Sequence, residues 1–279
     1  MGKGAKKSKK SVEKAELTGK AARKAEKKRQ KAAKARQDDA VQAVAWSHVL
    51  RVGPGFDLAE FDPASTPGFT GDRAAAEAVM AELQERTSDL QERLYAESRG
   101  GGQRSVLLVI QGMDTSGKGG IMRHVVGAVD PQGVEITSFK APTAEEKRHP
   151  FLWRIRRALP SAGDIGVFDR SHYEDVLVPV VNGWITPEQQ RQRLAHINDF
   201  ERMLSETGTV VVKFFLHIGF DEQRQRLQER LDDPAKHWKF SMGDIAVRKQ
   251  WGDYRRAYDT LLGATHTPWA PWTIVPANS

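Results

Sequence analysis

The chain has 279 residues, of which 39% are hydrophobic, and it carries a formal net charge of +7. It contains no cysteine, which excludes thiolate nucleophiles, thiolate metal sites and disulfides. Its longest apolar stretches, such as residues 106–110, are far shorter than the ~20 residues of a membrane-spanning helix. We therefore expect a cytoplasmic protein without a membrane span, folded around one large core.

The positive charge is concentrated at the N-terminus. Residues 1–36 hold 15 of the 43 lysines and arginines and three acids, so this segment carries +12 and the remaining chain −5. The segment is rich in Lys and Ala and has almost no large apolar side chain to bury. We expect residues 1–50 to form a basic arm that is disordered or partly helical. Two interpretations remain open, a solvated arm and an electrostatic contact for a polyanion.

A loop-rich stretch over residues 52–71 leads to the first predicted helix, which begins after Asp72 as its N-cap and ends near residue 98. The apolar residues of this helix recur at helical spacing, and we expect them to pack on the core. They are Val79, Leu83, Leu90 and Leu94. The glycines at 100–102 then end the helix.

Beyond residue 102, short apolar runs alternate with helix-length segments. The runs predict strands at about 105–111, 134–139, 164–169, 209–217 and 272–276, and the segments predict helices near 118–129, 143–159, 187–206 and 243–262. This alternation is typical of a parallel sheet that is covered on both faces. The predicted fold is α/β, with three layers and a five-stranded parallel sheet, in a single domain over residues 51–279.

The strongest motif lies in residues 105–120, where a buried strand is followed by Gly112, four residues, and the pair Gly117-Lys118. In such a loop, glycines let backbone N–H groups converge on phosphate oxygens, and the lysine adds a positive charge. The usual Ser or Thr after the lysine is replaced by Gly119. Asp114 lies inside the loop, where a carboxylate would repel phosphate unless it bound magnesium or oriented a nucleophile. A structural hydrogen bond from Asp114 is the alternative.

A second motif lies in residues 165–178, where an apolar strand ends in Asp169-Arg170. An acid at the carboxyl end of a buried strand, about fifty residues after a phosphate-binding loop, is typical of a magnesium-organising carboxylate. The adjacent Arg170 can stabilise a phosphate that is being transferred. We interpret His172 as a hydrogen-bonding or packing residue, because phosphoryl transfer depends on positioning more than on an imidazole.

A third motif is the basic stretch over residues 224–240. Arg226 and Arg230 are four residues apart on one helix face, and a loop with Lys236 and Lys239 follows. Together they predict a cationic flap over a phosphate chain, or else a solvated charged face. We interpret Trp238 and Phe240, in the same stretch, as packing anchors.

With these motifs the chain resembles the type-2 polyphosphate kinases, a family of P-loop kinases. The resemblance runs from about Phe56 to Asn278 and includes GMDTSGKGG, FDRSHYEDVLV, DPQGVEITSFKAPT, FLWRIRRALP, DDPAKHWKF and APWTIVPAN. It implies a P-loop kinase fold with a helical lid over about residues 222–245. The implied activity is magnesium-dependent, reversible transfer of a terminal phosphate between inorganic polyphosphate and nucleotides.

The resemblance also assigns roles to residues at matching positions. The implied catalytic residues are Asp114, Lys118, Asp169, Arg170 and Arg230, and the implied Mg²⁺ ligands are Asp114 and Asp169. Asp169 stands where many relatives carry Asn. Phosphate or nucleotide binding is implied for a larger set: Gly112, Met113, Thr115, Ser116, Gly117, Gly119, Lys140, Glu174, Asp175, Arg226 and Lys236.

The SHYEDV segment is most similar to the subgroup that phosphorylates AMP as well as ADP. The base could be adenine or guanine, and the resemblance favours a homo-oligomer, either a dimer or a tetramer. No specific nucleic-acid or membrane partner is expected. Two other functions remain open: an ATP-dependent nucleoside monophosphate kinase, built from the same motifs, and a non-catalytic polyanion-binding protein that uses the basic arm.

Overall fold

The computed structural model describes residues 26–27, 46, 48–53 and 56–278. The chain divides between Val49 and Leu50 into two units. In the first unit the described residues are helical, and the rest of the predicted basic arm lies outside the described residues. The second unit carries the sheet and the site. Among the described helices, none combines the length and apolar character needed to cross a membrane.

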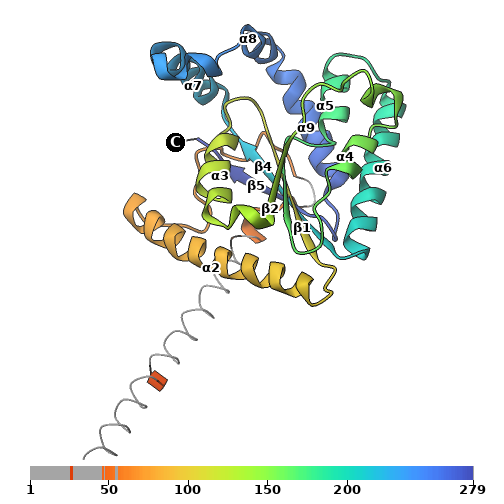
Figure 1. The fold of residues 1–279 in the computed structure, drawn as a ribbon. Coiled ribbons are helices and arrows are strands. Elements are labelled where there is room, and N and C mark those ends of the chain that lie inside the picture. The colour runs from red at the N-terminus through yellow and green to blue at the C-terminus, as the bar shows by residue number, and fades with distance from the viewer. Residues whose placement is uncertain (1–25, 28–45, 47, 54–55, 279) are drawn as a thin grey trace, which may run out of the picture. The chain divides into compact units, whose positions relative to one another are not determined.

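Five parallel strands form one sheet in the order β2-β3-β1-β4-β5 (Figure 1). They are β1 (Ser105–Gly112), β2 (Val134–Ser138), β3 (Ile165–Asp169), β4 (Thr209–His217) and β5 (Trp272–Pro276). All five predicted strands are therefore confirmed. The register pairs Ile110 with Asp169 and Gly112 with Leu216. The carboxyl ends of the three central strands consequently meet at one edge, where parallel α/β sheets place their ligands.

Helices cover both faces of the sheet, as the sequence predicts. On one face, α5 (Glu174–Val181), α6 (Pro187–Glu206) and α9 (Trp251–Thr265) share a core with alternate strand residues such as Leu107 and Phe215. On the other face, α3 (Lys118–His124) and the 3₁₀ turn that follows it cover Ile110 and Leu216. The strands are apolar on both sides because both sides are buried.

Several helix boundaries differ from the predicted ones. The predicted helix at 118–129 stops at His124. Residues 143–159 contain a 3₁₀ turn (Glu146–Arg148) and the short α4 (Trp153–Arg157), because Pro150 between them has no N–H to donate. The predicted helix at 243–262 is two helices, α8 (Met242–Lys249) and α9. Before them lies α7 (Phe220–Asp232), followed by a 3₁₀ turn over Pro234–Lys239.

The first predicted helix is confirmed as α2 (Arg73–Arg99), whose N-cap Asp72 accepts a hydrogen bond from the Ala75 N–H at 2.9 Å. The prediction that its apolar residues are core residues is wrong: Leu90 is 53% exposed, and Val79, Leu83 and Leu94 are half-buried and belong to neither hydrophobic core. In this helix the buried residue is Gln91. α2 contacts the two short 3₁₀ turns Val126–Ala128 and Pro131–Gly133, and most of its residues are exposed.

Candidate active site

The phosphate-binding loop connects β1 to α3 at the carboxyl edge of the sheet. Gly117 has a φ of +99°, a conformation that a side chain strongly disfavours. A Cβ at Gly112 would lie 2.8 Å from the backbone oxygen of Leu216, so the neighbouring strand also requires glycine. Met113 and Ser116 are buried, whereas Gly117 and Gly119 are exposed at the mouth of the loop. The loop therefore has the backbone shape that the sequence motif predicts.

Lys118 curls over this loop. Its Nζ donates to the carbonyl oxygens of Gly112 at 2.8 Å and Met113 at 3.2 Å. Burial lowers the pKa of Lys118, and the charge of Arg170 lowers it further, against the opposing effect of nearby carboxylates such as Asp114. The ammonium group is therefore held at the loop by weak neutral acceptors, which a phosphate oxygen can replace.

Asp114 and Arg170 form the central ion pair of the site. The Arg170 guanidinium donates to Asp114 Oδ1 at 2.7 Å. Arg170 itself has a φ of +64°, a left-handed conformation that costs a non-glycine residue about 1–2 kcal/mol. The bend that follows β3 therefore directs the Arg170 side chain toward the phosphate-binding loop at the cost of backbone strain. Strained residues of this kind are common at functional sites.

Three buried polar atoms at this edge have no hydrogen-bond partner among the described residues. They are Thr115 Oγ1, Ser116 Oγ and Asp169 Oδ1. Buried polar atoms are normally paired, so a group of orphaned oxygens next to an anion-binding loop indicates a site for a ligand. No cluster of three or more potential metal-binding side chains occurs in the described part of the chain. The donor set of Asp114 and Asp169 nevertheless fits Mg²⁺, which takes one or two carboxylates together with substrate phosphates and water.

The basic residues of the third motif differ in what they contact. Arg226 donates to the carbonyl oxygens of Thr115 at 3.0 Å and Ala277 at 2.6 Å, and it pairs with Glu222. It thus braces the phosphate-binding loop against the C-terminal segment. Because these donors are directed at protein acceptors, a phosphate contact from Arg226 would require an exchange of partners.

Arg230 and Lys236 lie further along the predicted lid. Arg230 donates to the carbonyl oxygen of Lys239 at 3.0 Å and pairs with Asp244 at 3.2 Å. Burial raises the pKa of Asp244, and so does the negative charge of Asp114. Lys236 pairs with Asp233 at 3.4 Å. The interpretation of Trp238 as a packing anchor is wrong, because this side chain is 78% exposed.

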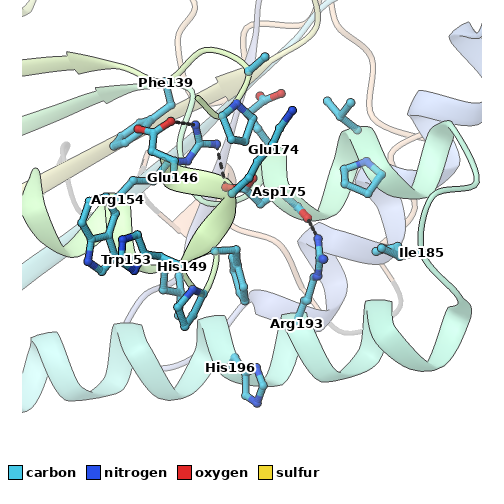
Figure 2. A pocket seen from close by; sticks show the side chains of 18 of the residues that line it. Phe139, Glu146, His149, Trp153, Arg154, Glu174, Asp175, Ile185, Arg193 and His196 are labelled. Atoms are coloured by element: carbon cyan, nitrogen blue, oxygen red, sulfur yellow. Dashed lines mark hydrogen bonds and ion pairs between the residues drawn. The ribbon is translucent and has the colours of Figure 1, made fainter. Parts of the chain in front are cut away.

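A cavity of about 1120 Å³ opens beside the ion pair (Figure 2). Arg170, Glu174, Asp175 and Lys140 are among its lining residues. The remaining wall is aromatic and basic: it includes Phe139, His149, Phe151, Trp153, Arg154, Trp184, Arg193 and His196. Lys140, Arg170, Glu174 and Asp175 were expected at the site, but the sequence did not indicate the cavity itself, because its wall comes from three segments that are separate in the sequence.

Two arrangements give the cavity its shape. The rings of His149 and Trp153 stack at 4.0 Å with an interplanar angle of 9°. Arg154, which is buried, donates to Asp175 Oδ2 at 2.8 Å (Figure 2), and it also donates to the Lys140 carbonyl oxygen at 2.8 Å. A planar apolar surface is therefore combined with fixed charges in one pocket, as in small-molecule sites generally.

Burial is the largest influence on the two acids at the start of α5. It raises the pKa of Glu174 against the opposing charges of Arg170 and Lys118. It also raises the pKa of Asp175, against its hydrogen bond with Arg154. In the orientation that satisfies both its polar atoms, the Gln111 amide donates to Glu174 Oε1 at 3.0 Å. Acids with raised pKa values inside a cavity are typical of functional sites.

The model of the polyphosphate kinase 2 (PPK2) family matches residues 70–279. A relative from Meiothermus ruber, an AMP/ADP-polyphosphate phosphotransferase, is 48% identical over 80% of this chain and 82% of its own length. An ADP-polyphosphate phosphotransferase from Rhodopseudomonas palustris is 41% identical over 82% of each chain. The crystal structure of polyphosphate kinase 2 from Arthrobacter aurescens TC1 superposes with a TM-score of 0.81 at 56% identity, covering 83% of this chain and 82% of that one.

Proposed function

Because the chain belongs to the polyphosphate kinase 2 family, we propose that it transfers a terminal phosphate reversibly between inorganic polyphosphate and the nucleotides AMP and ADP. The observation that carries this proposal is the Asp114–Arg170 pair, which stands between the phosphate-binding loop and a cavity of nucleotide size. Donor and acceptor phosphates would meet at that pair. The names of the relatives favour neither ATP-dependent monophosphate kinase activity nor a purely binding role.

We assign the donor side to the loop and the lid. The backbone N–H groups of residues 112–119 would bind phosphate oxygens, and Lys118 would exchange its carbonyl acceptors for a terminal phosphate. Arg230 and Lys236 would hold the polyphosphate chain from the lid, whose closure would exclude water from the transfer. Each of these cations recognises repeated phosphate charge and needs no sequence in the chain it binds.

We assign the acceptor nucleotide to the cavity. The stacked rings of His149 and Trp153 offer a flat surface for the base, and Arg170 lies where the acceptor phosphate would approach the loop. Glu174 and Asp175, which line the cavity, would orient the nucleotide by hydrogen bonds. We propose both adenine and guanine as acceptor bases.

Mg²⁺ would be held by Asp114 and Asp169, and it would supply positive charge that offsets the charge developing on the transferred group. Arg170, which pairs with Asp114, would share this electrostatic role. Asp114 therefore has a carboxylate that is already oriented, since its Oδ1 is held by Arg170 and its backbone oxygen accepts from Gln223 at 3.0 Å. Such preorganisation is the main contribution that a protein makes to phosphoryl transfer.

We further propose that the protein acts in the cytoplasm, where its nucleotide acceptors are, and as a homo-oligomer. The exposed Met80 and Leu90 of α2 provide apolar surface that a second copy could cover. Sedimentation of the purified chain tests the oligomeric state.

The deciding experiment is an assay for ADP and ATP formed from AMP and polyphosphate with Mg²⁺, and for ATP formed from ADP and polyphosphate. Product from both acceptors supports the proposal, and product from ADP alone removes AMP from it. Phosphorylation of AMP by ATP but not by polyphosphate would support a monophosphate kinase instead. For a kinase, a chain lacking residues 1–36 should retain turnover. For a non-catalytic polyanion-binding protein, the same deletion should abolish polyanion binding, and the full chain should show no turnover with any phosphate donor.

A further inference from the structure

A buried ion pair lies in the core below the site, between α6 and β4. Lys213 and Glu201 are both 0% exposed, and their charged atoms are 2.6 Å apart. Lys213 Nζ also donates to the Tyr173 hydroxyl at 2.9 Å and the Thr265 carbonyl oxygen at 2.8 Å. The phosphoryl transfer proposed above uses neither charge. A lysine and a glutamate in a core cost desolvation free energy, and apolar residues of the same size often serve stability as well.

The second carboxylate oxygen of Glu201, Oε1, links the ion pair to His172 and Tyr173. Glu201 Oε1 accepts a hydrogen bond from the Tyr173 hydroxyl at 2.6 Å and lies 3.2 Å from His172 Nε2. His172 and Tyr173 are both fully buried. The prediction that His172 is a hydrogen-bonding residue agrees with this contact. Glu201 and Lys213 together thus bind two consecutive residues of the connection between β3 and α5.

That connection carries active-site residues at both of its ends. Asp169 ends β3, Arg170 follows in its left-handed conformation, and α5 begins with Glu174 and Asp175. A strained residue persists only where its surroundings determine its conformation. The contacts that hold this bend include those of Glu201 with residues 172 and 173 and that of Lys213 with the Tyr173 hydroxyl. Gln111 also hydrogen-bonds Ser171 Oγ at 3.0 Å, and the Arg170 N–H donates to the Ile110 carbonyl oxygen at 3.2 Å.

We propose that the Glu201–Lys213 pair is a positioning device for the active site. It acts through Tyr173 and His172, and it holds Arg170 against Asp114 while it aims Glu174 and Asp175 into the cavity. Glu201, Lys213 and Tyr173 are therefore positioning residues for the proposed phosphoryl transfer, on which this inference rests. The pair orients the bend because Lys213 fixes the Glu201 carboxylate from below, leaving its other oxygen as the acceptor for Tyr173.

The first test is the double variant Glu201→Leu/Lys213→Met, which replaces the ion pair by apolar side chains. Such replacements often leave stability unchanged, whereas a small displacement of reacting groups costs up to about 100-fold in rate. We expect kcat with AMP and polyphosphate to fall at least about 10-fold and the KM for AMP to rise, with the thermal unfolding midpoint within a few degrees of the wild type. Wild-type kcat and KM in the folded double variant would overturn the proposal.

The second test keeps the ion pair and removes the Tyr173 hydroxyl, which donates to Glu201 and accepts from Lys213. Tyr173→Phe deletes the hydroxyl that links the bend to Glu201, and we expect kcat/KM to fall roughly 3- to 10-fold. If the double variant does not fold, this variant decides alone, and an unchanged kcat/KM overturns the proposal. The matched control is Val211→Ala, a buried position on the same face of β4 two residues from Lys213. It should lower the unfolding midpoint and leave kcat and KM unchanged.

The wild-type assay separates this inference from the function on which it depends. A wild type without polyphosphate-dependent activity refutes the proposed function. An active wild type, together with fully active variants at positions 173, 201 and 213, refutes the positioning role alone.

Discussion

Arg170 reaches across the sheet edge to Asp114, at 2.7 Å, although the two residues are 56 positions apart in the chain. Each comes from a different strand end, and the parallel register of β1 and β3 is what brings them together. The pair holds the carboxylate in one orientation before any substrate arrives, because the Arg170 guanidinium binds its Oδ1. The charge of Asp114, and not only its shape, should therefore matter.

Asp114→Asn retains the size of the side chain and a hydrogen-bond acceptor for Arg170, but it removes the negative charge. We expect turnover of AMP or ADP with polyphosphate to fall on the order of 100-fold or more, and higher Mg²⁺ concentrations to recover only part of it. Steady-state kinetics across a Mg²⁺ titration measures both effects. The comparison is Asp169→Asn, which keeps an oxygen near the orphaned Oδ1 position and should lose less. Full activity in Asp114→Asn contradicts the role of the carboxylate.

Glu174→Gln should stabilise the protein at neutral pH. Burial raises the pKa of Glu174 above 4.5, so the folded state binds this proton more tightly than the unfolded state does. Stability from this group is then fully present below about pH 4.5 and is lost as the pH rises through the raised pKa. The glutamine variant has no such loss, and we expect it to gain about 1 kcal/mol at pH 7 and nothing below pH 4. Urea unfolding at several pH values measures this, and a gain that is independent of pH would refute it.

Trp153→Ala removes half of the stacked surface in the cavity. If the base rests there, the KM for AMP should rise roughly 3- to 10-fold while the KM for polyphosphate stays constant. Trp238→Ala is the matched control, because Trp238 is an exposed tryptophan of the lid outside the cavity wall. It should leave the KM for AMP unchanged. A rise confined to the polyphosphate KM in Trp153→Ala would place the base elsewhere.

Arg226→Lys should weaken the phosphate-binding loop without changing the net charge. The guanidinium bridges the carbonyl oxygens of Thr115 and Ala277, and a single ammonium group cannot span both in the same geometry. We expect kcat/KM for polyphosphate to fall about 10-fold. Arg224→Lys, an exposed arginine two residues earlier on α7, should change it less than about twofold. Equal effects of the two substitutions would mean that Arg226 acts by charge alone.

The strands were predictable because each is a run of apolar residues bounded by Gly, Pro or polar residues, and because both faces of the sheet are buried. Helix ends were less predictable. The segment around α4 has helical composition, but Pro150 interrupts its hydrogen bonds. The helix α5 was not predicted, because its residues were interpreted as a catalytic motif. Leu90 has the periodicity of a core residue, yet it is 53% exposed, because periodicity marks the apolar side of a helix and not whether a partner covers that side.

The phosphate-binding loop and the consecutive residues Asp169 and Arg170 were predictable, because each is a short local pattern at the end of a strand. The cavity was not predictable, because Phe139, Trp153 and His196 are far apart in the sequence and only the fold brings them together. Asp244 was likewise not predicted, since its contact with Arg230 depends on how α8 follows α7. Such relationships are long-range in the sequence and carry no period or spacing that a single chain reveals.

Because Lys213 is completely buried, its chemical labelling can be used to measure how often the surrounding core opens. An amine-reactive reagent cannot reach an ammonium group with no exposed surface, so acylation of Lys213 requires the core around it, formed by Glu201, Tyr173 and Thr265, to open. Mass spectrometry of the labelled peptide would then measure the fraction of molecules in which this core has opened, whereas exposed lysines label at once. If nucleotide or polyphosphate stabilises the closed core, the labelling of Lys213 should slow in proportion to the occupancy of the site.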